Sequence, residues 1–529
     1  MEKIWLKSYP AGVPAEIDVN AYASLVDVLD ESVRLYGDHT AFICMGKAIS
    51  YTQLDHMSRD FAAYLQGVLG LKKGDRVVLM MPNVLQYPVC LFGVLRAGCI
   101  VVNCNPLYTA AELEYQINDA DAETIIILEN FAHVLQDAVS HTSIKHILTT
   151  QLGDMLGPIK GAVVNFVVKY IKKMVPAWTL PGAVSLSVAL RKGSDIQPKL
   201  VPVPLAHDDI AFLQYTGGTT GVSKGAMLTQ RNLVANLLQA RAWIKPYLGD
   251  GPQIVITALP LYHVFALTAN CLTFVALGAA NVLITNPRDI AGFVNTLAKY
   301  KFTAFTGVNT LFNALLEHPK FSRLDFSHLR ITLGGGMAVQ KAVAMRWKAV
   351  TKVTLIEAYG LTETSPAVSI NPLDLAEFNG SIGLPLPSTD IAIRDDAGND
   401  LPLGEAGELC VSGPQVMAGY WRQPEETAKV MMSDGFLRTG DMAVVDAQGF
   451  IRIVDRKKDL IVVSGFKVFP NEVEDALALH PGVREVAVIG VPDGHSGEAV
   501  KAFVVKRDPA LTAEELVAHC RKTLVAYKV

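Results

Sequence analysis

Strand and helix patterns alternate along the first 200 residues, and this alternation restricts the fold more than any other feature of the sequence. In Ala21–Tyr36 apolar residues recur every three to four positions, the spacing of an amphipathic helix. The segments 75–81 and 124–128 each contain a continuous apolar run that is typical of a buried strand, and a helical stretch at 83–97 follows the first of them. Strands that alternate with helices favour a largely parallel, doubly wound sheet. We therefore expect an α/β fold.

Length and charge balance exclude several classes of protein. The chain has 529 residues, more than one hydrophobic core usually supports, so more than one domain is expected. A hydrophobic fraction of 50% excludes a disordered chain. Lys and Arg total 47 against 51 Asp and Glu, a net charge of −4, which argues against nucleic-acid binding through bulk positive charge.

The seven cysteines indicate a reducing compartment rather than a disulfide framework or a zinc site. Their number is odd, and no two of them have the C-x-x-C spacing. Most have apolar neighbours, as in the stretch 97–102, which is typical of small buried side chains. Residues 1–7 lack the apolar core of a secretory signal. These features favour a cytoplasmic protein.

Two segments raise the question of membrane contact. Val264–Ile284 holds 21 residues without a charge, enough for a span, but Thr and Asn side chains interrupt it and no basic cluster flanks it. We interpret it as a buried helix followed by a strand. Residues 158–200 carry seven Lys and Arg against Asp195 alone, with apolar residues between them. Such a segment can lie on the anionic inner face of a membrane, and the alternative is a solvated insertion helix with one face on the core.

The most informative motif follows a predicted strand at 209–215. It reads YTGGTTGVSKGA over residues 215–226 and combines four glycines, several hydroxyl side chains and Lys224. Because glycine permits positive φ, successive amide groups can converge on an anion, and the hydroxyl and ammonium groups add donors. This composition suits a polyphosphate. The spacing differs from the P-loop of ordinary NTPases, since Lys224 stands three positions after Gly221 and precedes Gly225.

Further motifs follow in order along the chain. They are PLYHVF at 260–265, LGGGMA at 333–338, YGLTETSP at 359–366, LRTGD at 437–441 and VDRKKD at 454–459. With the loop at 215–226, they resemble the motifs of the acyl-adenylate-forming superfamily of acyl-CoA synthetases, luciferases and nonribosomal adenylation domains. The resemblance covers essentially the whole chain, and the run at 434–474 is similar to the signature of bacterial long-chain fatty acid–CoA ligases.

The resemblance implies both a domain organisation and a two-step reaction. We expect a large, multi-layer N-terminal AMP-binding domain at 1–455 and a small, mobile α+β C-terminal domain at 456–529. A carboxylate oxygen attacks the α-phosphorus of ATP, giving an acyl adenylate and pyrophosphate, and the thiol of coenzyme A then displaces AMP. Because the first step gathers anionic oxygens at one phosphorus, cations and fixed donors should supply most of the catalysis. ATP, Mg²⁺ and coenzyme A are the expected cofactors, with a fatty acid as substrate.

Residue roles follow from the motif positions. The loop at 216–224 should hold the β- and γ-phosphates, Glu363 should bind Mg²⁺ with Thr216 nearby, and Asp441 should accept hydrogen bonds from the ribose. The expected catalytic residues are Lys224, His263, Thr362, Glu363 and Arg456. The expected binding residues are Tyr215, Thr216, Gly217, Gly218, Thr219, Thr220, Gly221, Lys224, Gly335, Gly336, Glu357, Ala358, Tyr359, Gly360, Thr362, Asp441, Arg456, Lys458 and Gly465.

Several of these residues also have ordinary structural interpretations. His263, a lone histidine among apolar neighbours, is often a packed core residue, whereas the resemblance sets it beside the acyl carboxylate. Glu363 is alternatively a surface or capping carboxylate, Asp441 a turn residue and Arg456 part of a linker ion pair. By the resemblance Tyr359 stacks on adenine and Thr362 reaches the α-phosphate.

The resemblance also implies movement of the C-terminal domain. Lys458 occupies the position of the family's hinge, and Gly465 should lie along a channel for the pantetheine arm, where a side chain would obstruct passage. Family members carry a later motif whose lysine reaches the α-phosphate, and we find no such motif in 501–529. We expect the sequence to be truncated at this point and the 529-residue chain to adenylate poorly.

The acyl site is the least defined part of the prediction. Candidate wall residues are Phe265, Val308, Phe312 and Gly335. Since each buried methylene contributes roughly 0.8 kcal/mol, small changes in the tunnel alter chain-length preference. Only the signature at 434–474 favours long-chain acids. Medium-chain or aryl acids, a carrier-protein ligase or nonribosomal adenylation domain, and a non-catalytic acyl or nucleotide-binding protein remain alternatives.

Overall fold

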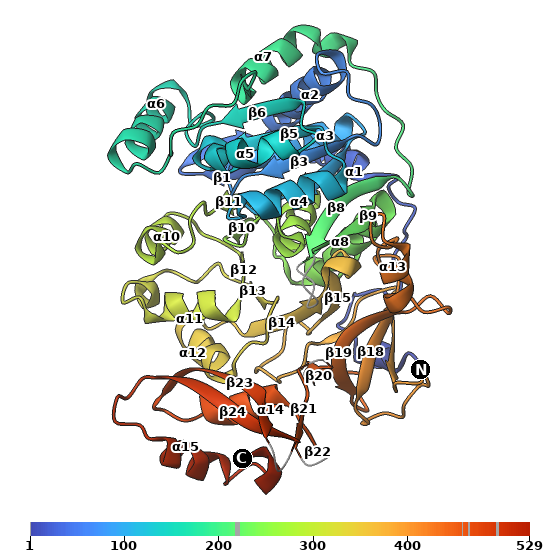
Figure 1. Cartoon of the computed structure of the whole chain (residues 1–529), viewed down its shortest axis with the longest axis vertical. Coiled ribbons are helices and arrows are strands. Elements are labelled where there is room, and N and C mark those ends of the chain that lie inside the picture. Colours follow the sequence, from blue (N-terminus) through green and yellow to red (C-terminus); the bar gives the residue numbers. More distant parts are fainter. Residues whose placement is uncertain (1, 217–222, 458, 464–465, 494–496) are drawn as a thin grey trace.

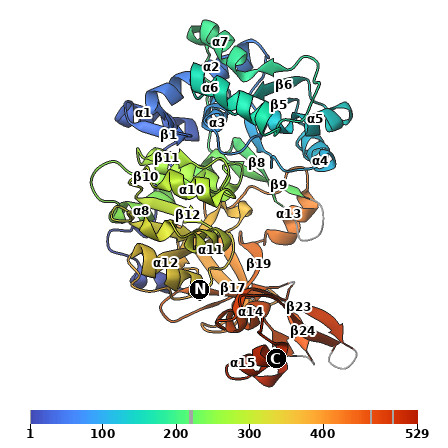
Figure 2. The ribbon, with the colours of Figure 1, turned by 90° about the vertical axis from the view of Figure 1, so that its left-hand side faces the viewer.

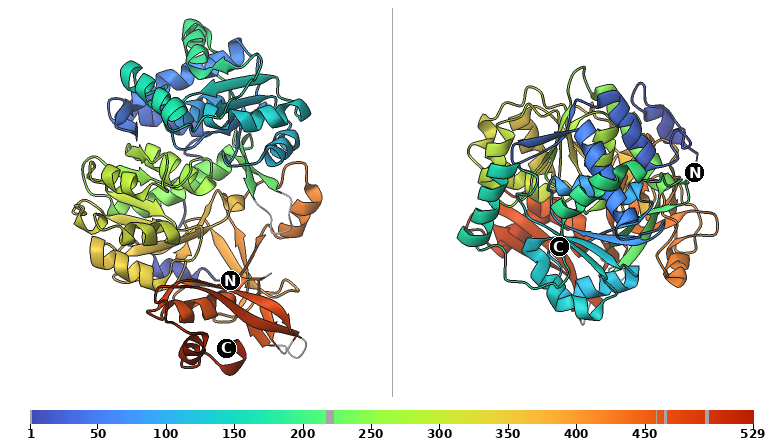
Figure 3. Two further views of the ribbon diagram at one scale, coloured as in Figure 1. Left: turned by 60° about the vertical axis from the view of Figure 1, so that its left-hand side comes forward. Right: turned by 90° about the horizontal axis from the view of Figure 1, so that it is seen from above.

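The structure is a computed structural model of the chain, and it describes residues 2–216, 223–457, 459–463, 466–493 and 497–529 (Figure 1). These residues form a large N-terminal domain with three sheets and a small C-terminal domain with one sheet. The C-terminal domain lies at one end of the long axis of the molecule, beside the third sheet (Figures 2 and 3). The α/β fold and the two-part architecture agree with the prediction.

The first sheet accounts for the alternating pattern of the N-terminal region. Its strand order is β7-β6-β5-β3-β4-β8-β9, and all neighbours are parallel except β8 and β9. The strands are β3 (Arg76–Met80), β4 (Ile100–Asn103), β5 (Thr124–Leu128), β6 (His146–Thr150), β7 (Val184–Ser185), β8 (Ile210–Thr216) and β9 (Lys224–Thr229). The helices of this region are α2 (Tyr51–Gly67), α3 (Gln86–Arg96), α4 (Ala110–Ala120), α5 (Ala132–Ala138), α6 (Pro158–Phe166) and α7 (Leu186–Ile196).

Both faces of this sheet are buried. On β3, Val77 and Leu79 belong to the apolar cluster that contains α3, whereas Val78 and Met80 belong to the cluster that contains α4 and α5. A parallel strand covered on both faces has no solvent side, which explains why its sequence is continuously apolar rather than alternating.

The second sheet carries nine strands in the order β16-β15-β14-β13-β12-β10-β11-β1-β2. The six strands from β14 to β1 are parallel to their neighbours, and antiparallel strands extend both edges. The strands are β1 (Thr40–Cys44), β2 (Lys47–Ser50), β10 (Ile254–Thr257), β11 (Ala280–Leu283), β12 (Ala304–Gly307), β13 (Ile331–Gly334), β14 (Leu355–Gly360), β15 (Ala367–Ile370) and β16 (Leu384–Pro385). The accompanying helices are α1 (Leu25–Tyr36), α8 (Gln230–Ile244), α9 (Thr273–Ala276), α10 (Ile290–Leu297), α11 (Asn309–Glu317) and α12 (Lys341–Thr351).

The third and fourth sheets are antiparallel and four-stranded. The third contains β17 (Asp390–Arg394), β18 (Gly407–Ser412), β19 (Leu437–Val445) and β20 (Ile451–Arg456), with α13 (Pro424–Val430) between β18 and β19 in sequence. The fourth contains β21 (Ile461–Val463), β22 (Phe466–Val468), β23 (Val483–Asp493) and β24 (Gly497–Lys506), together with α14 (Pro470–Ala478) and α15 (Ala513–Cys520). The fourth sheet and its helices share an apolar cluster of their own, which includes Ile461, Val473 and Leu516.

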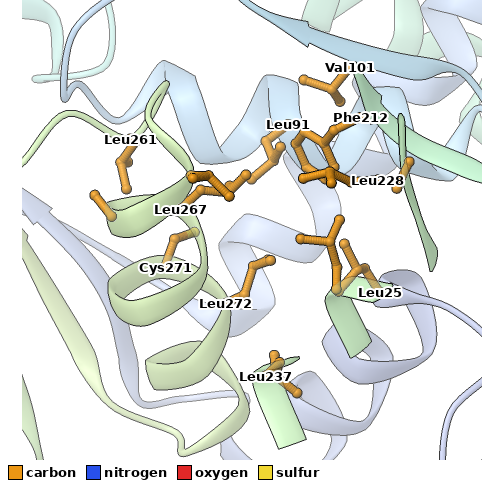
Figure 4. Packing of buried hydrophobic residues seen from close by; sticks show 14 of the residues in the cluster. Leu25, Leu91, Val101, Phe212, Leu228, Leu237, Leu261, Leu267, Cys271 and Leu272 are labelled. Atoms are coloured by element: carbon orange, nitrogen blue, oxygen red, sulfur yellow. The ribbon is translucent and has the colours of Figure 1, made fainter. Parts of the chain in front are cut away.

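The uncharged stretch Val264–Ile284 is part of the core. It forms a π-helix at Ala266–Leu272, continues into α9 and ends in β11, so the predicted buried helix followed by a strand is confirmed. Leu267 and Leu272 belong to the largest apolar cluster, in which Leu267 lies beside Leu91 (Figure 4). This cluster holds residues of both large sheets, including Phe212 of β8 and Leu283 of β11. In the part of the chain that the structure describes, no helix is long and apolar enough to cross a membrane.

The seven cysteines are all buried as free thiols, as their apolar neighbours predict. Burial raises the pKa of the Cys99 thiol to about 12 and that of Cys410 to about 11. The pKa values of Cys90, Cys104 and Cys271 are also raised, because burial disfavours the thiolate.

Candidate active site

The predicted phosphate-binding loop connects the two antiparallel strands β8 and β9. Thr216 pairs with Lys224 across this hairpin, so the loop starts and ends at one point of the sheet edge. Ser223 Oγ donates a hydrogen bond to the Thr216 carbonyl oxygen over 2.9 Å. The predicted residues between these ends, Gly217, Gly218, Thr219, Thr220 and Gly221, lie outside the described residues.

Tyr215 is buried under the hairpin. Its hydroxyl donates to Asp119 Oδ2 over 2.5 Å, and burial together with this carboxylate raises the pKa of the phenol. The ring also closes over Gly225, where an added Cβ would lie 3.1 Å from it. The hydroxyl of Tyr215 is thus engaged with α4, and the residue supports the hairpin from below.

Lys224, the first residue of β9, points toward α13. Its ammonium group forms an ion pair with Glu426 and lies 5.2 Å from the centre of the Tyr420 ring. Glu426 also pairs with Lys429 one turn further along the helix. These two ammonium groups lower the pKa of Glu426 to about 2.

Glu363 follows β14 in a short 3-10 helix at Thr362–Thr364. Its Oε1 accepts a hydrogen bond from the Tyr420 hydroxyl over 2.7 Å, and its carbonyl oxygen accepts from the Met417 amide over 2.8 Å. Tyr420 therefore touches both predicted residues, Lys224 through its ring and Glu363 through its hydroxyl. Lys224 and Glu363 are brought to one place although 139 positions separate them in sequence.

A cavity of about 260 Å³ opens beside Glu363. Its walls come from the segments around β14, α13, β18 and β19, and its lining includes Leu361, Glu363, Glu408, Tyr420, Lys429, Thr439 and Lys457. Carboxylates and ammonium groups face the same space. Mg²⁺ is usually held by one or two carboxylates together with substrate phosphates, and Glu363 fits that role. Among the described residues no group of three or more His, Cys, Asp or Glu could hold a metal ion alone.

Tyr359, Asp441 and Arg456 form a second polar group. The Tyr359 hydroxyl donates to Asp441 Oδ2 over 2.5 Å, and Arg456 Nε lies 3.4 Å from Asp441 Oδ1. Asp441 and Arg456 are register partners on β19 and β20. Burial raises the pKa of Asp441, while Tyr359 and Arg456 act in the opposite direction. The three predicted residues are thus neighbours.

Strand β14, which is parallel to β13 and antiparallel to β15 in the second sheet, leads to this group. Glu357 is buried, its Oε1 accepts a hydrogen bond from the Val339 amide over 2.8 Å, and burial raises its pKa to about 8. At Gly360 an added Cβ would lie 1.9 Å from the Pro366 carbonyl oxygen, so only glycine fits there. Ala358 pairs with Ile370 of β15 on this strand.

The predicted acyl region lies beside the turn after β13. An added Cβ on Gly335 would lie 3.1 Å from the Phe265 ring, and one on Gly336 would lie 3.7 Å from Val308. Three of the four candidate wall residues are therefore close together. The fourth, Phe312, is fully buried with its ring 4.8 Å from Trp347, and an added Cβ on Gly334 would lie 3.5 Å from the same ring.

His263 lies at the start of the same region, directly before the π-helix. Its Nδ1 accepts a hydrogen bond from the Phe265 amide over 3.3 Å, and desolvation by the surrounding protein lowers its pKa. Because Nδ1 accepts this bond, the neutral form of the imidazole carries its proton on Nε2. The predicted Lys458 and Gly465 lie outside the described residues.

Sequence reasoning missed Tyr420, Glu426 and Lys429. The stretch GYWRQPEE at 419–426, between β18 and β19, holds two acidic residues and two aromatic rings. The charges of this stretch were the available sign of a functional role, but Lys224, the partner of Glu426, lies 202 positions earlier in the sequence.

Comparison with known proteins identifies the family. The model of the AMP-binding enzyme family matches residues 29–421, and the model of the AMP-binding enzyme C-terminal domain matches residues 472–529. The chain belongs to the AMP-binding enzyme family. The predicted membership of the acyl-adenylate-forming superfamily is confirmed.

Relatives in this family are similar along the whole chain. Long-chain-fatty-acid–CoA ligases of Escherichia coli O6:H1 and of Haemophilus influenzae are 59% and 52% identical to it, and both alignments cover 100% of this chain and 94% of the relative. The ligase of the same name from Bacillus subtilis is 38% identical, with 100% and 93% coverage.

Solved structures of family members share the fold. The anthranilate CoA ligase AuaEII in complex with anthranoyl-AMP is 25% identical, with a TM-score of 0.84 over 97% of this chain and 93% of that one. ATP-bound MatB from Rhodopseudomonas palustris is 28% identical, with a TM-score of 0.80 over 95% and 93%.

Proposed function

We propose that the chain is a long-chain fatty acid–CoA ligase that forms AMP. The observation that carries this proposal is identity of 52–59% over the whole chain with relatives of that name, together with Tyr420, which lines the cavity with Glu363 and contacts both Glu363 and Lys224. A ligase of acids with thiols needs a site that accepts a polyphosphate and a carboxylate together. Cationic and carboxylate side chains around a cavity support this use.

In the first step, a fatty acid carboxylate oxygen bonds to the α-phosphorus of ATP, and the bond from that phosphorus to the bridging oxygen breaks, releasing pyrophosphate. Lys224 would hold the β- and γ-phosphates, and Thr362 would donate to the α-phosphate. The acid is already ionised at neutral pH, so no general base is needed. His263 next to the acyl region supports close approach of the anion, because an imidazole whose Nδ1 already accepts from the Phe265 amide can donate from Nε2.

Mg²⁺, when bound beside Glu363, supplies charge neutralisation between the phosphate oxygens. Glu363 would hold the ion, and Tyr420 would keep the carboxylate in place by donating to its other side. Thr216, at the end of β8, is the proposed neighbour of this ion.

The ribose of the nucleotide would lie against Asp441. A carboxylate that already accepts from Tyr359 and lies near Arg456 is fixed in orientation, which supports its use as an acceptor for two hydroxyl groups. Gly335, Gly336, Glu357, Ala358 and Gly360 would frame the adenine. In the second step the coenzyme A thiol attacks the acyl carbonyl carbon and AMP leaves, with Lys458 as the proposed hinge and Gly465 along the thiol's path.

Exchange of labelled pyrophosphate into ATP tests the proposal directly. The exchange requires acid, ATP and reversible adenylate formation, and it does not require coenzyme A. We expect it with long-chain acids and weaker exchange with medium-chain and aryl acids, since each methylene contributes roughly 0.8 kcal/mol. Exchange that depends on benzoate but not on a long-chain acid would reject the long-chain assignment. No exchange with any acid, with ATP binding intact, would favour a non-catalytic binding protein.

We also propose that the segment 158–174 contacts the inner face of a membrane, which gives a cytoplasmic protein with peripheral attachment. Helix α6 and the π-helix Val167–Ile171 lie at the periphery of the molecule (Figure 1). The inner stripe, Gly161, Asn165 and Val168, faces the protein, and Asn165 bonds to the Gly153 amide and to Gln151.

The outer stripe of this segment is apolar. It consists of Ile159, Val163, Phe166, Tyr170, Ile171 and Met174, whose side chains are 52–81% exposed. Positions 159, 163, 166 and 170 have helical spacing, so they form one continuous face. Lys172 and Lys173 are exposed at its end. An exposed apolar face bordered by cations suits an anionic lipid surface. We expect the chain to float with phosphatidylglycerol-containing vesicles and less with neutral ones, and absence of flotation would reject membrane contact.

A further inference from the structure

Helix α13 is held firmly against the strand that carries Lys224. The preceding segment 418–421 pairs with β9: the Met227 amide donates to the Gly419 carbonyl oxygen over 2.9 Å, and the Trp421 amide donates to the Gly225 carbonyl oxygen over 2.8 Å. The Tyr420 amide then donates to Thr427 Oγ1 of α13 over 2.8 Å. The side chains of α13 therefore have a fixed position relative to Lys224, and Figure 2 shows α13 beside β9.

The ion pair between Lys224 and Glu426 is partly shielded from solvent. The two side chains are 17% and 28% exposed, and the Tyr420 ring covers one side of the ammonium group. Glu426 uses its two oxygens for different partners, Oε2 for Lys224 and Oε1 for Lys429. It therefore keeps a cationic partner when Lys224 turns away.

Building on the proposed function, we infer that Glu426 competes with polyphosphates for Lys224. It is a positioning residue that occupies the ammonium group of Lys224 before ATP arrives and takes it back when pyrophosphate leaves. A carboxylate and a phosphate on the same ammonium group repel each other, so ATP must displace Glu426 from Lys224. Lys429 receives the released carboxylate. The exchange lowers the affinity for ATP and for pyrophosphate and thereby favours release of pyrophosphate.

The inference predicts a selective gain of affinity in Glu426→Gln. The amide has no charge with which to hold Lys224, so the dissociation constants for Mg·ATP and for magnesium pyrophosphate should fall by up to about fivefold, the upper end of the range for a partly exposed ion pair. The dissociation constant for AMP should not change, because AMP lacks the phosphates that Lys224 would hold. A purely structural role of Glu426 would move all three ligands together or none.

Glu425→Gln is the matched control. Glu425 stands one position earlier in the same first turn, is exposed, and gives the same change of charge on substitution. Both variants and the wild type are compared as 529-residue chains by isothermal titration calorimetry with Mg·ATP, magnesium pyrophosphate and AMP, after thermal melting has shown that they are folded. Glu426→Asp is the second variant, since it keeps the charge but withdraws the carboxylate by one methylene, and it should fall between wild type and Glu426→Gln.

The outcomes separate this inference from the proposed function. Tighter binding of ATP and pyrophosphate by Glu426→Gln alone, with unchanged AMP binding, supports competition. Equal affinities in wild type and Glu426→Gln, equal gains in Glu425→Gln, or weaker binding in Glu426→Gln each overturn the inference while the proposed function stands. Absence of heat with ATP and pyrophosphate in the wild type overturns both.

Discussion

The apolar outer stripe of the segment 158–174 makes a quantitative prediction about membrane binding. Replacing Phe166 and Ile171 together by serine removes two large exposed apolar side chains, which are 56% and 65% exposed. Full burial of such a side chain contributes about 1.5–3 kcal/mol, so insertion of the exposed parts contributes about 1–2 kcal/mol each. The double variant should lose about 3 kcal/mol of membrane binding, or about a hundredfold in partition coefficient.

The assay is vesicle flotation over a range of lipid concentrations, with vesicles that contain phosphatidylglycerol. The matched control replaces Phe503 and Val505 of β24 by serine in the same way. These two side chains are 51% and 48% exposed and lie in the C-terminal domain. This control removes a similar apolar area and should leave partitioning unchanged. An equal loss in both double variants would mean that general surface hydrophobicity drives binding, and it would refute the assignment of the contact to this segment. Full binding by Phe166→Ser/Ile171→Ser would refute it as well.

Three further predictions concern the candidate site. Glu363→Gln should lower the rate of pyrophosphate exchange about a hundredfold or more and raise the Mg²⁺ concentration that exchange requires, since a carboxylate ligand is lost. An unchanged Mg²⁺ dependence in exchange assays would contradict the metal assignment. Gly360→Ala should lower the free energy of unfolding by about 3 kcal/mol in urea melts, because its Cβ would lie 1.9 Å from the Pro366 carbonyl oxygen, and a normal melt would contradict this. Burial raises the pKa of Glu357 from 4.5 to about 8, so the folded protein holds this proton more tightly than the unfolded chain does. The resulting contribution to the free energy of unfolding is complete below pH 4.5 and declines as the pH rises toward 8. Urea melts from pH 5 to 8 should show this decline in wild type and not in Glu357→Gln, and parallel curves would count against it.

Much of the fold was predictable because buried segments have an apolar amino-acid composition that is visible in the sequence. Within the run at 75–81, every position from Val77 to Met81 is apolar, since β3 is covered on both faces. The stretch Val264–Ile284 was assigned to the core because polar residues such as Thr268 and Asn270 interrupt it, and both are buried in the structure. The local sequence was sufficient in these cases, because the environment of each helix or strand determines which residues it contains.

The candidate site was only partly predictable, because its geometry depends on contacts between distant segments. The motifs at 359–366 and 437–441 were identified by resemblance, and the hydrogen bond from Tyr359 to Asp441 crosses 82 positions. The pairing of Lys224 with Glu426 could not be predicted from the neighbouring sequence, since several acidic residues were possible partners of that lysine. For the segment 158–174 the amphipathic pattern was visible, but the direction in which its apolar side chains point depends on how Asn165 anchors the helix.

The burial of all seven cysteines has a consequence for chemistry with a sulfur nucleophile. A protein that works with a thiol cosubstrate is at risk of forming mixed disulfides with it, and thiols reach such disulfides only through an accessible thiolate. Here the raised pKa values and the surrounding core keep the protein's own sulfur atoms out of that exchange. A colorimetric thiol reagent added to the folded protein should therefore report the consumption of coenzyme A without a background from the enzyme.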